Sequence, residues 1–223
     1  MEQMGLEEEI PESSLGLEKN RNNQMEPLWG TEIFPEYYSR FEKAARETEG
    51  VTLTWEGHFI DPLFTHTTTG FTRPGDEEHP YLASVSCVHD PEEEGFVQEM
   101  IMQPEEAAKR VSAIPAGDGS FRTIPPEAFP EQVQIISRDE AGYALQLQIG
   151  GFPFNGEEVR LALGLPSACF ELNRHGSDVR FTVRGRGHGW GLSQTEAQAL
   201  AEDGWSAEAI LEYFYTGISF SSE

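Results

Sequence analysis

The sequence is short of basic residues, of cysteine and of long hydrophobic runs, and each shortage narrows the possible functions. Against 39 acidic residues there are only 15 Lys and Arg, so the formal net charge is -24. Nucleic-acid binding needs a basic face to meet the phosphate backbone, so nucleic acid is not an expected partner. No apolar run approaches the roughly 20 residues of a membrane helix. Residues 1–12 also lack the basic-then-apolar order of a signal peptide. We therefore expect no export or anchoring signal in this chain.

The two cysteines, Cys87 and Cys169, allow one disulfide at most. Two cysteines far apart in the sequence do not establish the redox compartment, so two reduced, partly buried thiols are the simpler alternative. Hydrophobic residues make up 38% of the chain, which is typical of a folded globular protein rather than a disordered one.

The hydrophobic pattern predicts an α+β fold with mainly antiparallel strands, because helical and strand-like segments are segregated along the chain. We expect residues 1–27 to form an acidic helix and connector, and residues 28–220 to form one domain. Tyr143, Leu145, Leu147 and Ile149 should share one face of a strand. The predicted helices are 34–49, 104–112, 156–163, 194–202 and 206–215. The predicted strands are a hairpin of 51–55 and 58–60, an extended segment 65–69, the strands 81–88, 133–136 and 143–149, and a hairpin of 169–172 and 179–183.

The most informative segment is the glycine-histidine loop, which we define as residues 185–194, GRGHGWGLSQ. Glycine occupies every second position from 185 to 191, which makes a poor strand interior. Such glycines allow positive φ or a close approach of the backbone to another group. Ser193 followed by Glu196 is the capping-box pattern of a helix start. The loop should therefore carry His188 and Trp190 to a helix N-terminus, where free N–H groups favour anions and polar acyl groups.

A basic island surrounds this loop. Residues 179–195 contain no Asp or Glu, whereas Arg180, Arg184 and Arg186 all lie there. An acidic ligand could be held locally even though the whole chain is acidic. Each residue also has a structural explanation, since Ser193 could be only a helix cap, His188 a bonded loop histidine and Trp190 a cover on the core. The residues alone thus predict a concave site with His, Trp and Arg for an unspecified ligand.

The closing segment, GRGHGWGLSQTEAQALAEDGWSAEAILEYFYTG, resembles the signature of the stage II sporulation protein D family. That family shows Gly-His-Gly-x-Gly-Met-Ser-Gln, an alanine-rich helix, a glycine, and a helix with Ile-Leu before aromatic residues. Here Leu192 replaces the usual methionine, and Glu196 stands where glycine is common. The segments 45–50, 53–60, 64–72, 80–85, 158–160 and 163–170 follow in the family's order, so the resemblance covers about residues 28–220.

The resemblance implies a lytic transglycosylase that acts in engulfment during endospore formation. Such enzymes cut peptidoglycan between N-acetylmuramic acid and N-acetylglucosamine, using one carboxyl group as acid and then as base. The implied partners are peptidoglycan glycan strands and other sporulation cell-wall hydrolases. The implied location is extracytoplasmic and membrane-associated, and no cofactor is expected. The residues expected to bind substrate are Thr68, Gly70, Arg184, Arg186, His188, Gly189, Trp190, Gly191, Ser193 and Gln194.

The chain departs from the family in the segment that carries the catalytic glutamate. The family places that residue in a Glu-Met-Pro segment and a following helix, both before the region that matches 29–50. Neither is present, so we expect an N-terminally truncated domain without catalytic residues and without activity of its own. Glu99 and Met100 imitate the segment, but they follow 80–85 and Pro104 comes three residues late. The family's Ser/Gly-rich segment is also altered, with Phe71 after Gly70 where a second glycine is usual.

Two other functions remain open. The chain could be a glycan-binding module without catalysis, built on the same cleft wall. It could also bind zinc, because His66, His79, Cys87 and His89 lie close together in the sequence, although their spacing fits no standard zinc finger.

Overall fold

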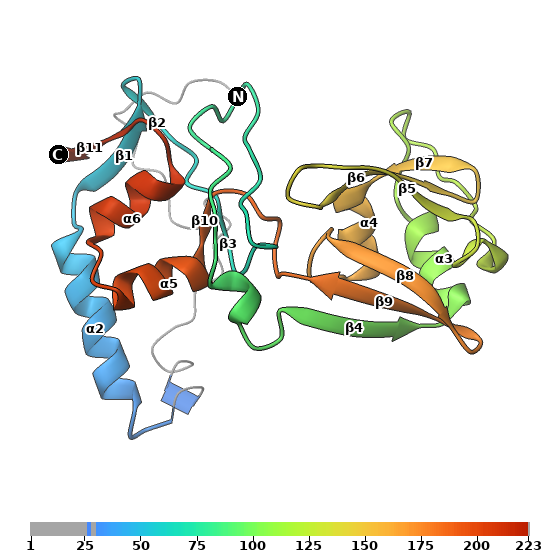
Figure 1. The fold of residues 1–223 in the computed structure, drawn as a ribbon, viewed down its shortest axis with the longest axis horizontal. Helices are drawn as coiled ribbons and strands as arrows, with labels where there is room; N and C mark the ends of the chain where they lie inside the picture. The colour runs from blue at the N-terminus through green and yellow to red at the C-terminus, as the bar shows by residue number, and fades with distance from the viewer. Residues whose placement is uncertain (1–25, 28–29, 223) are drawn as a thin grey trace. The chain divides into compact units, whose positions relative to one another are not determined.

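The computed structural model describes residues 26–27 and 30–222, so the predicted helix and connector at 1–27 lie almost wholly outside the described residues. The chain divides into two compact units, residues 1–51 with 222–223 and residues 52–221. Five α-helices and eleven mostly antiparallel strands are described, which confirms the α+β prediction (Figure 1). Within the described residues no helix is long and apolar enough to cross a membrane.

The first unit contributes one helix, α2 (Phe34–Glu47), which confirms the helix predicted at 34–49. Pro35 stands in its first turn, where the missing N–H has no cost. Ion pairs four residues apart, Arg40 with Glu36 and Arg46 with Glu42, lie along its exposed surface.

The predicted N-terminal hairpin is confirmed as β1 (Val51–Trp55) and β2 (His58–Phe59). Its two turn residues, Glu56 and Gly57, both have positive φ, of 50° and 82°. This is the conformation that a two-residue hairpin needs to follow the strand twist. The third strand of this sheet, β11 (Ile218–Ser222), was not predicted.

The two predicted helices near the end of the chain are confirmed as α5 (Gln194–Glu202) and α6 (Ala207–Phe214), and the unpredicted β11 follows them. Serines cap both of them, Ser193 for α5 and Ser206 for α6. The helices pack on a core cluster whose buried members are Tyr81, Leu82, Cys87, Leu200, Ile210, Phe214 and Tyr215.

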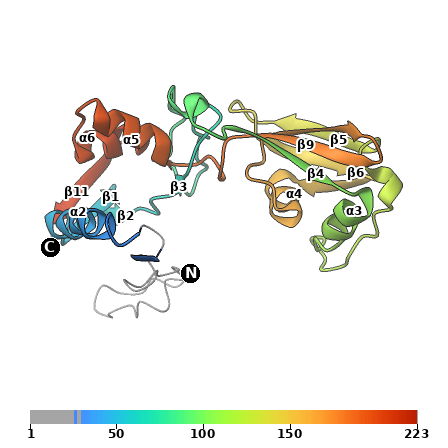
Figure 2. The ribbon, with the colours of Figure 1, turned by 90° about the horizontal axis from the view of Figure 1, so that it is seen from below.

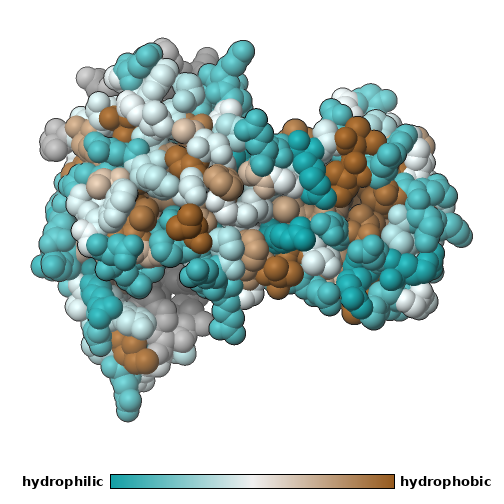
Figure 3. All heavy atoms as spheres, viewed as in Figure 1, coloured by the Kyte–Doolittle hydropathy of each residue, from teal (hydrophilic) through white to brown (hydrophobic). Residues whose placement is uncertain are grey.

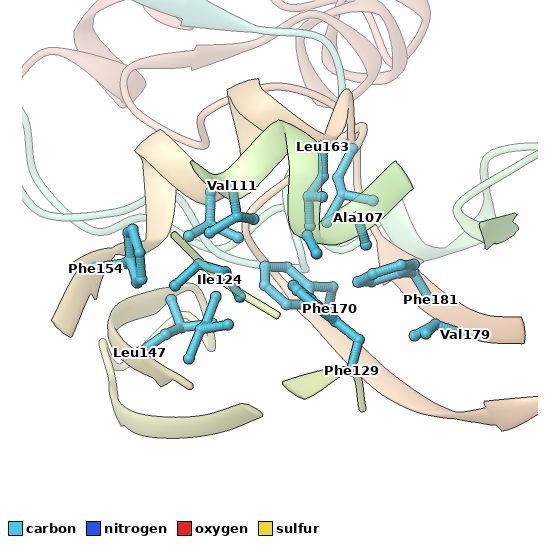
Figure 4. Close-up of a cluster of buried hydrophobic side chains, with 14 of the residues drawn as sticks. Ala107, Val111, Ile124, Phe129, Leu147, Phe154, Leu163, Phe170, Val179 and Phe181 are labelled. Atoms are coloured by element: carbon cyan, nitrogen blue, oxygen red, sulfur yellow. The ribbon is translucent and has the colours of Figure 1, made fainter. Parts of the chain in front are cut away.

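A second core lies between two three-stranded antiparallel sheets and two helices. One sheet has the order β4 (Val97–Met102), β9 (Asp178–Arg184) and β8 (Phe170–His175), and the other has β5 (Val133–Arg138), β6 (Ala144–Ile149) and β7 (Phe152–Asn155). The helices are α3 (Pro104–Ser112) and α4 (Gly156–Leu163), both with the predicted bounds (Figure 2). Phe170 and Phe181 meet edge to face in this core (Figure 4).

Several strand predictions need correction. The predicted strand 81–88 contains only the isolated bridges of Leu82 and Ser86. The reason is that Thr72 uses both backbone polar groups of Val85. The Val85 N–H donates to the Thr72 hydroxyl, and the Thr72 N–H donates to the Val85 carbonyl. The strands β4 and β7 were not predicted.

Leu145 also differs from the prediction, because it faces outward with 39% exposure while Tyr143, Leu147 and Ile149 are buried. The β5–β6 register shifts twice here. Ser137 pairs with Gln146 and Arg138 with Ala144, so Leu145 is an extra residue without a partner. A bulge of this kind turns a side chain to the other face of the sheet.

Most of the surface in Figure 3 is hydrophilic, as the net charge requires, and hydrophobic side chains interrupt it in small groups.

Candidate functional site

The glycine-histidine loop connects β9 with the short strand β10 (Leu192–Ser193), which pairs in parallel with β3 (Phe64–Thr65). All four alternating glycines have positive φ, as predicted: 74° at Gly185, 112° at Gly187, 85° at Gly189 and 69° at Gly191. The groups that these glycines approach closely belong to other segments of the same chain. A Cβ at 191 would lie 1.8 Å from the Leu63 carbonyl oxygen, and one at 189 would lie 2.4 Å from the Tyr143 ring. These glycines therefore serve internal packing of the loop.

The loop is held by Arg73, which is 3% exposed. Its Nε lies 2.6 Å from Asp139 Oδ2, and its Nη1 lies 3.1 Å from Glu157 Oε1 and donates to the His188 carbonyl. Its backbone N–H donates to the Gly189 carbonyl at 2.8 Å.

The Arg73 guanidinium also stacks on aromatic rings, 3.7 Å from the Trp190 centroid and 4.8 Å from that of Tyr143. Stacking of a cation on an aromatic face is stabilising, most of all for Trp. Arg73 thus fixes one face of the Trp190 indole.

Trp190 lines an open pocket of about 410 Å³. Its polar lining consists of the buried Arg73, Asp139, and the exposed Asp76 with His79. Apolar contacts come from the side chains Leu63, Pro74, Leu82 and Leu145. We call this the Trp190 pocket. A flat indole beside a few fixed polar groups is the usual composition of a small-ligand site.

His188 does not line the pocket but supports it. Its Nδ1 accepts the Trp190 backbone N–H at 3.1 Å, so the proton of the neutral ring is on Nε2. The two rings lie 5.6 Å apart. Burial lowers the pKa of His188, so the ring is neutral at pH 7. Because neutral His188 accepts the backbone N–H of Trp190, its role is to orient Trp190.

The buried carboxylate of Asp90 bonds both Thr68 and Ser193, the residue that precedes α5. Its Oδ2 accepts the N–H and hydroxyl of Thr68, both at 2.6 Å, and the Ser193 hydroxyl donates to the carboxylate at 2.8 Å. Burial raises the pKa of Asp90, while the Thr68 and Ser193 hydrogen bonds act in the opposite direction. Ser193 therefore caps α5 through Glu196 N–H and also satisfies this carboxylate.

The predicted capping box is only half formed. Glu196 is 2% exposed and does not return to the cap residue, because its carboxylate accepts from the backbone N–H of His89 at 2.8 Å and lies 3.1 Å from His89 Nδ1. The hydrogen bond with Glu196 raises the pKa of His89. This explains why glutamate can stand where the family commonly has glycine.

Ser193→Ala should lower the free energy of unfolding by roughly 2–3 kcal/mol, because it removes a cap and leaves the buried Asp90 carboxylate short of a donor. Ser206→Ala is the matched control, since Ser206 caps α6 by accepting only the Ala209 N–H. It should cost about 1 kcal/mol. Urea unfolding of both variants measures the difference, and equal losses would contradict a role for Ser193 beyond capping.

The basic island is largely neutralised within the sheets. Arg184 pairs with Glu171 at 3.2 Å, and Arg180 lies 3.6 Å from Glu99. Glu99 therefore lies on β4 near Arg180 and does not line the Trp190 pocket. Among the described residues, Arg186 is exposed without an ion-pair partner, so it alone of the three keeps a free guanidinium.

Other predicted site residues lie away from solvent. Thr68 is fully buried on Asp90, and Gly70 and Gly191 are buried too, which favours structural roles for all three over the expected contact with substrate. Gln194 is exposed at the first position of α5. Cys87 and Cys169 are both free and buried, so the structure has two separate thiols and not the disulfide that the sequence allowed.

The four residues of the zinc hypothesis have separate partners or surroundings. His66 contacts Thr67 at 2.7 Å, His79 contacts Asp76 at 2.8 Å, and His89 contacts Glu196. Burial raises the pKa of Cys87 to about 12, which disfavours a thiolate. Within the described residues no three His, Cys, Asp or Glu side chains converge as a metal site would require.

Sequence reasoning missed Arg73, Asp139 and Asp90. One signal for Arg73 was available, because it is the only Lys or Arg between Arg46 and Lys109. A single base in such an acidic stretch is a candidate for a buried ion pair. Asp90 lies at the start of an acidic run, 90–94 with one proline, and nothing in that run marks it as the buried member.

Comparison with known proteins supports the resemblance carried by the closing motif. No family model matches the chain. Two curated proteins do, both called stage II sporulation protein D. The one from Bacillus amyloliquefaciens is 28% identical over 203 residues, 89% of this chain and 56% of that protein. The one from Bacillus subtilis (strain 168) is 28% identical over 205 residues, 89% of this chain and 55% of that protein.

Both similarities support the resemblance to the stage II sporulation protein D family that the closing motif indicated. The chain spans about half the length of the curated relatives it matches.

Proposed function

We propose that this protein acts in sporulation, as the name of its relatives suggests, and that it binds glycan strands of peptidoglycan in the Trp190 pocket. The observation that carries the proposal is the stacking of Trp190 on the buried Arg73 at 3.7 Å. It orients the half-buried indole in the lining of the pocket, where the apolar face of a sugar ring can pack against it. The setting of the proposed activity is the cell wall, outside the cytoplasmic membrane, with other sporulation wall hydrolases as partners.

The polar groups of the pocket suit a sugar. Asp139 and the exposed Asp76 offer acceptors for hydroxyl and acetamido N–H groups, and the Asp76–His79 pair lies within the same pocket. Because the long-range field of a chain with net charge -24 repels an acidic polymer, recognition must rest on such short-range contacts.

Trp190→Ala should weaken binding to denuded glycan strands by about 1–3 kcal/mol, roughly 5- to 150-fold in affinity. His188→Ala should weaken it less, because His188 acts through Trp190. The measurement is a pull-down with insoluble denuded peptidoglycan, with thermal melts to verify folding. Trp205→Ala is the control, because Trp205 is 44% exposed and does not line the pocket. Equal binding by the Trp190 and Trp205 variants would reject the proposal.

We further propose that the 223-residue chain alone binds glycan without cleaving it. Lytic cleavage needs a carboxyl group that can protonate the leaving oxygen. Of the carboxyl groups lining the pocket, Asp139 accepts from the Arg73 guanidinium at 2.6 Å, so this contact occupies one of its oxygens. The hydrogen bond with His79 lowers the pKa of Asp76, so Asp76 favours the ionised form and is a poor acid at neutral pH.

The expected result is that purified sacculi incubated with the chain release no anhydro-muropeptides above background in mass spectrometry. A lytic transglycosylase run in parallel provides the positive control. Release that grows with protein concentration and is lost in Asp76→Asn would contradict the proposal and assign the acid to Asp76.

A further inference from the structure

The β-bulge in the β5–β6 pair places a hydrophobic side chain where the strand pattern would not. Leu145 is the unpaired residue between two register positions, and it stands outward next to another outward residue, Gln146. Bulges often re-aim side chains beside functional sites. The destination of Leu145 is therefore informative.

Leu145 lines two pockets at once. It forms part of the Trp190 pocket, and it also lines a neighbouring pocket of about 320 Å³. We call the second one the Arg122 pocket, since its other polar members include Arg122, Gln146, Asn155 and Glu158. The two pockets therefore adjoin across the side chain of Leu145, which we call the ridge between them. Two adjoining pockets suit a chain-like ligand of several units better than a single sugar.

Arg122 has the properties of an anion-binding group. Its Nη1 donates to the Pro153 carbonyl at 3.1 Å, and its guanidinium lies 5.0 Å from the ring centroid of the buried Phe154. These contacts orient it, and within the described part of the chain it makes no ion pair with a carboxylate. Asp118 is held mainly by hydrogen bonds from Ser120, with a smaller attraction to Arg122, and no ion pair of Arg122 forms among the described residues. In a chain where acids outnumber bases 39 to 15, a partly buried arginine without an ion-pair partner is notable. Glu158 lines the same pocket but does not pair with it.

We propose that the Arg122 pocket is a second subsite for the same strand and binds the carboxylate of an acidic sugar, one ridge away from the sugar on Trp190. This inference rests on the proposed function and adds to it a preference for carboxylate-bearing glycan over neutral glycan. Arginine is the side chain best suited to a planar carboxylate, because two parallel N–H groups can donate to it. Leu145 supplies the apolar contact under the linkage between the two units.

The test measures affinity for two soluble ligands of equal length, denuded glycan strands whose muramic acid carries a free carboxylate, and N-acetylglucosamine oligomers without one. Arg122→Gln should weaken the acidic ligand about tenfold or more and leave the neutral ligand unchanged. Leu145→Ser, at a residue that lines both pockets, should weaken both ligands severalfold. The controls are Arg174→Gln, an exposed arginine paired with Glu131, and Leu161→Ser, at a leucine 67% exposed on α4.

The outcomes separate the two proposals. Loss of binding in Trp190→Ala together with wild-type affinities in Arg122→Gln would overturn the second subsite and leave the proposed function standing. Equal losses for acidic and neutral ligands in Arg122→Gln, with Arg174→Gln unchanged, would also overturn it. Absence of binding of any glycan to the wild-type chain would overturn both.

Discussion

Replacing Arg73 by methionine should lower the free energy of unfolding by about 3 kcal/mol and abolish glycan binding. Methionine keeps much of the side-chain volume but removes the only cation between Asp139 and Glu157, which are 12% and 21% exposed. Removing one partner of a buried ion pair leaves the other charge uncompensated, at a typical cost of roughly 3–5 kcal/mol. Glu157 keeps Arg160 at 2.7 Å, so we expect the lower end of that range.

The matched control is Arg174→Met, which breaks an ion pair with Glu131 whose members are 55% and 52% exposed. An exposed pair contributes at most about 1 kcal/mol. Arg73→Lys separates charge from geometry, because lysine keeps the charge but cannot contact Asp139 and Glu157 from two nitrogens of one planar group that also stacks on Trp190. Urea unfolding and glycan pull-down are measured on all three variants. Similar stabilities of the Arg73→Met and Arg174→Met variants would contradict the assignment of Arg73 as the anchor of the loop.

Gly189→Ala should destabilise the protein by roughly 2–5 kcal/mol or prevent folding. The new Cβ would lie 2.4 Å from Tyr143 Cζ, and φ at this position is 85°. Left-handed backbone costs a residue with a side chain about 1–2 kcal/mol, and the overlap with a fully buried ring adds an overpacking cost of about 1–3 kcal/mol. Tyr143 cannot move aside, because it is 0% exposed within the packed interior.

Gly176→Ala tests the backbone cost alone. Gly176 lies in the β8–β9 turn with φ of 64°, and a Cβ there would meet nothing within 4 Å. It should lose only about 1 kcal/mol. Thermal melts of both variants give the comparison. A Gly189→Ala protein as stable as Gly176→Ala would show that the loop is not packed against Tyr143 as described.

Local signals in the sequence predicted the local structure well. Helix α3 matches its predicted bounds because Pro104 opens it, Glu105 and Glu106 follow in the first turn, and Lys109 and Arg110 lie in the last. The alternating glycines predicted positive φ, and all four have it. In both cases the residues that determine the local conformation lie within a few positions of it, so the conformation can be predicted from one sequence.

The site depended on contacts that no local pattern contains. Arg73 reaches Asp139, 66 residues away, and the Thr68–Asp90–Ser193 hydrogen bonds join segments up to 125 residues apart. The bulge at Leu145 is equally hidden, because alternation of hydrophobic residues continues through it and predicts a buried leucine. A wall of the pocket therefore could not be predicted until the β5–β6 register was known.

The most direct test of the central claim is an NMR titration of the protein with denuded glycan strands, following the indole Nε1–H signals. The Trp190 signal is assigned by its loss in Trp190→Phe, and Trp205, exposed and outside the pocket, serves as an internal reference. We expect a saturable shift of the Trp190 signal, because its Nε1–H donates to the Pro74 carbonyl and both residues line the proposed glycan site. A Trp190 signal that stays in place while the protein binds the strands would contradict it.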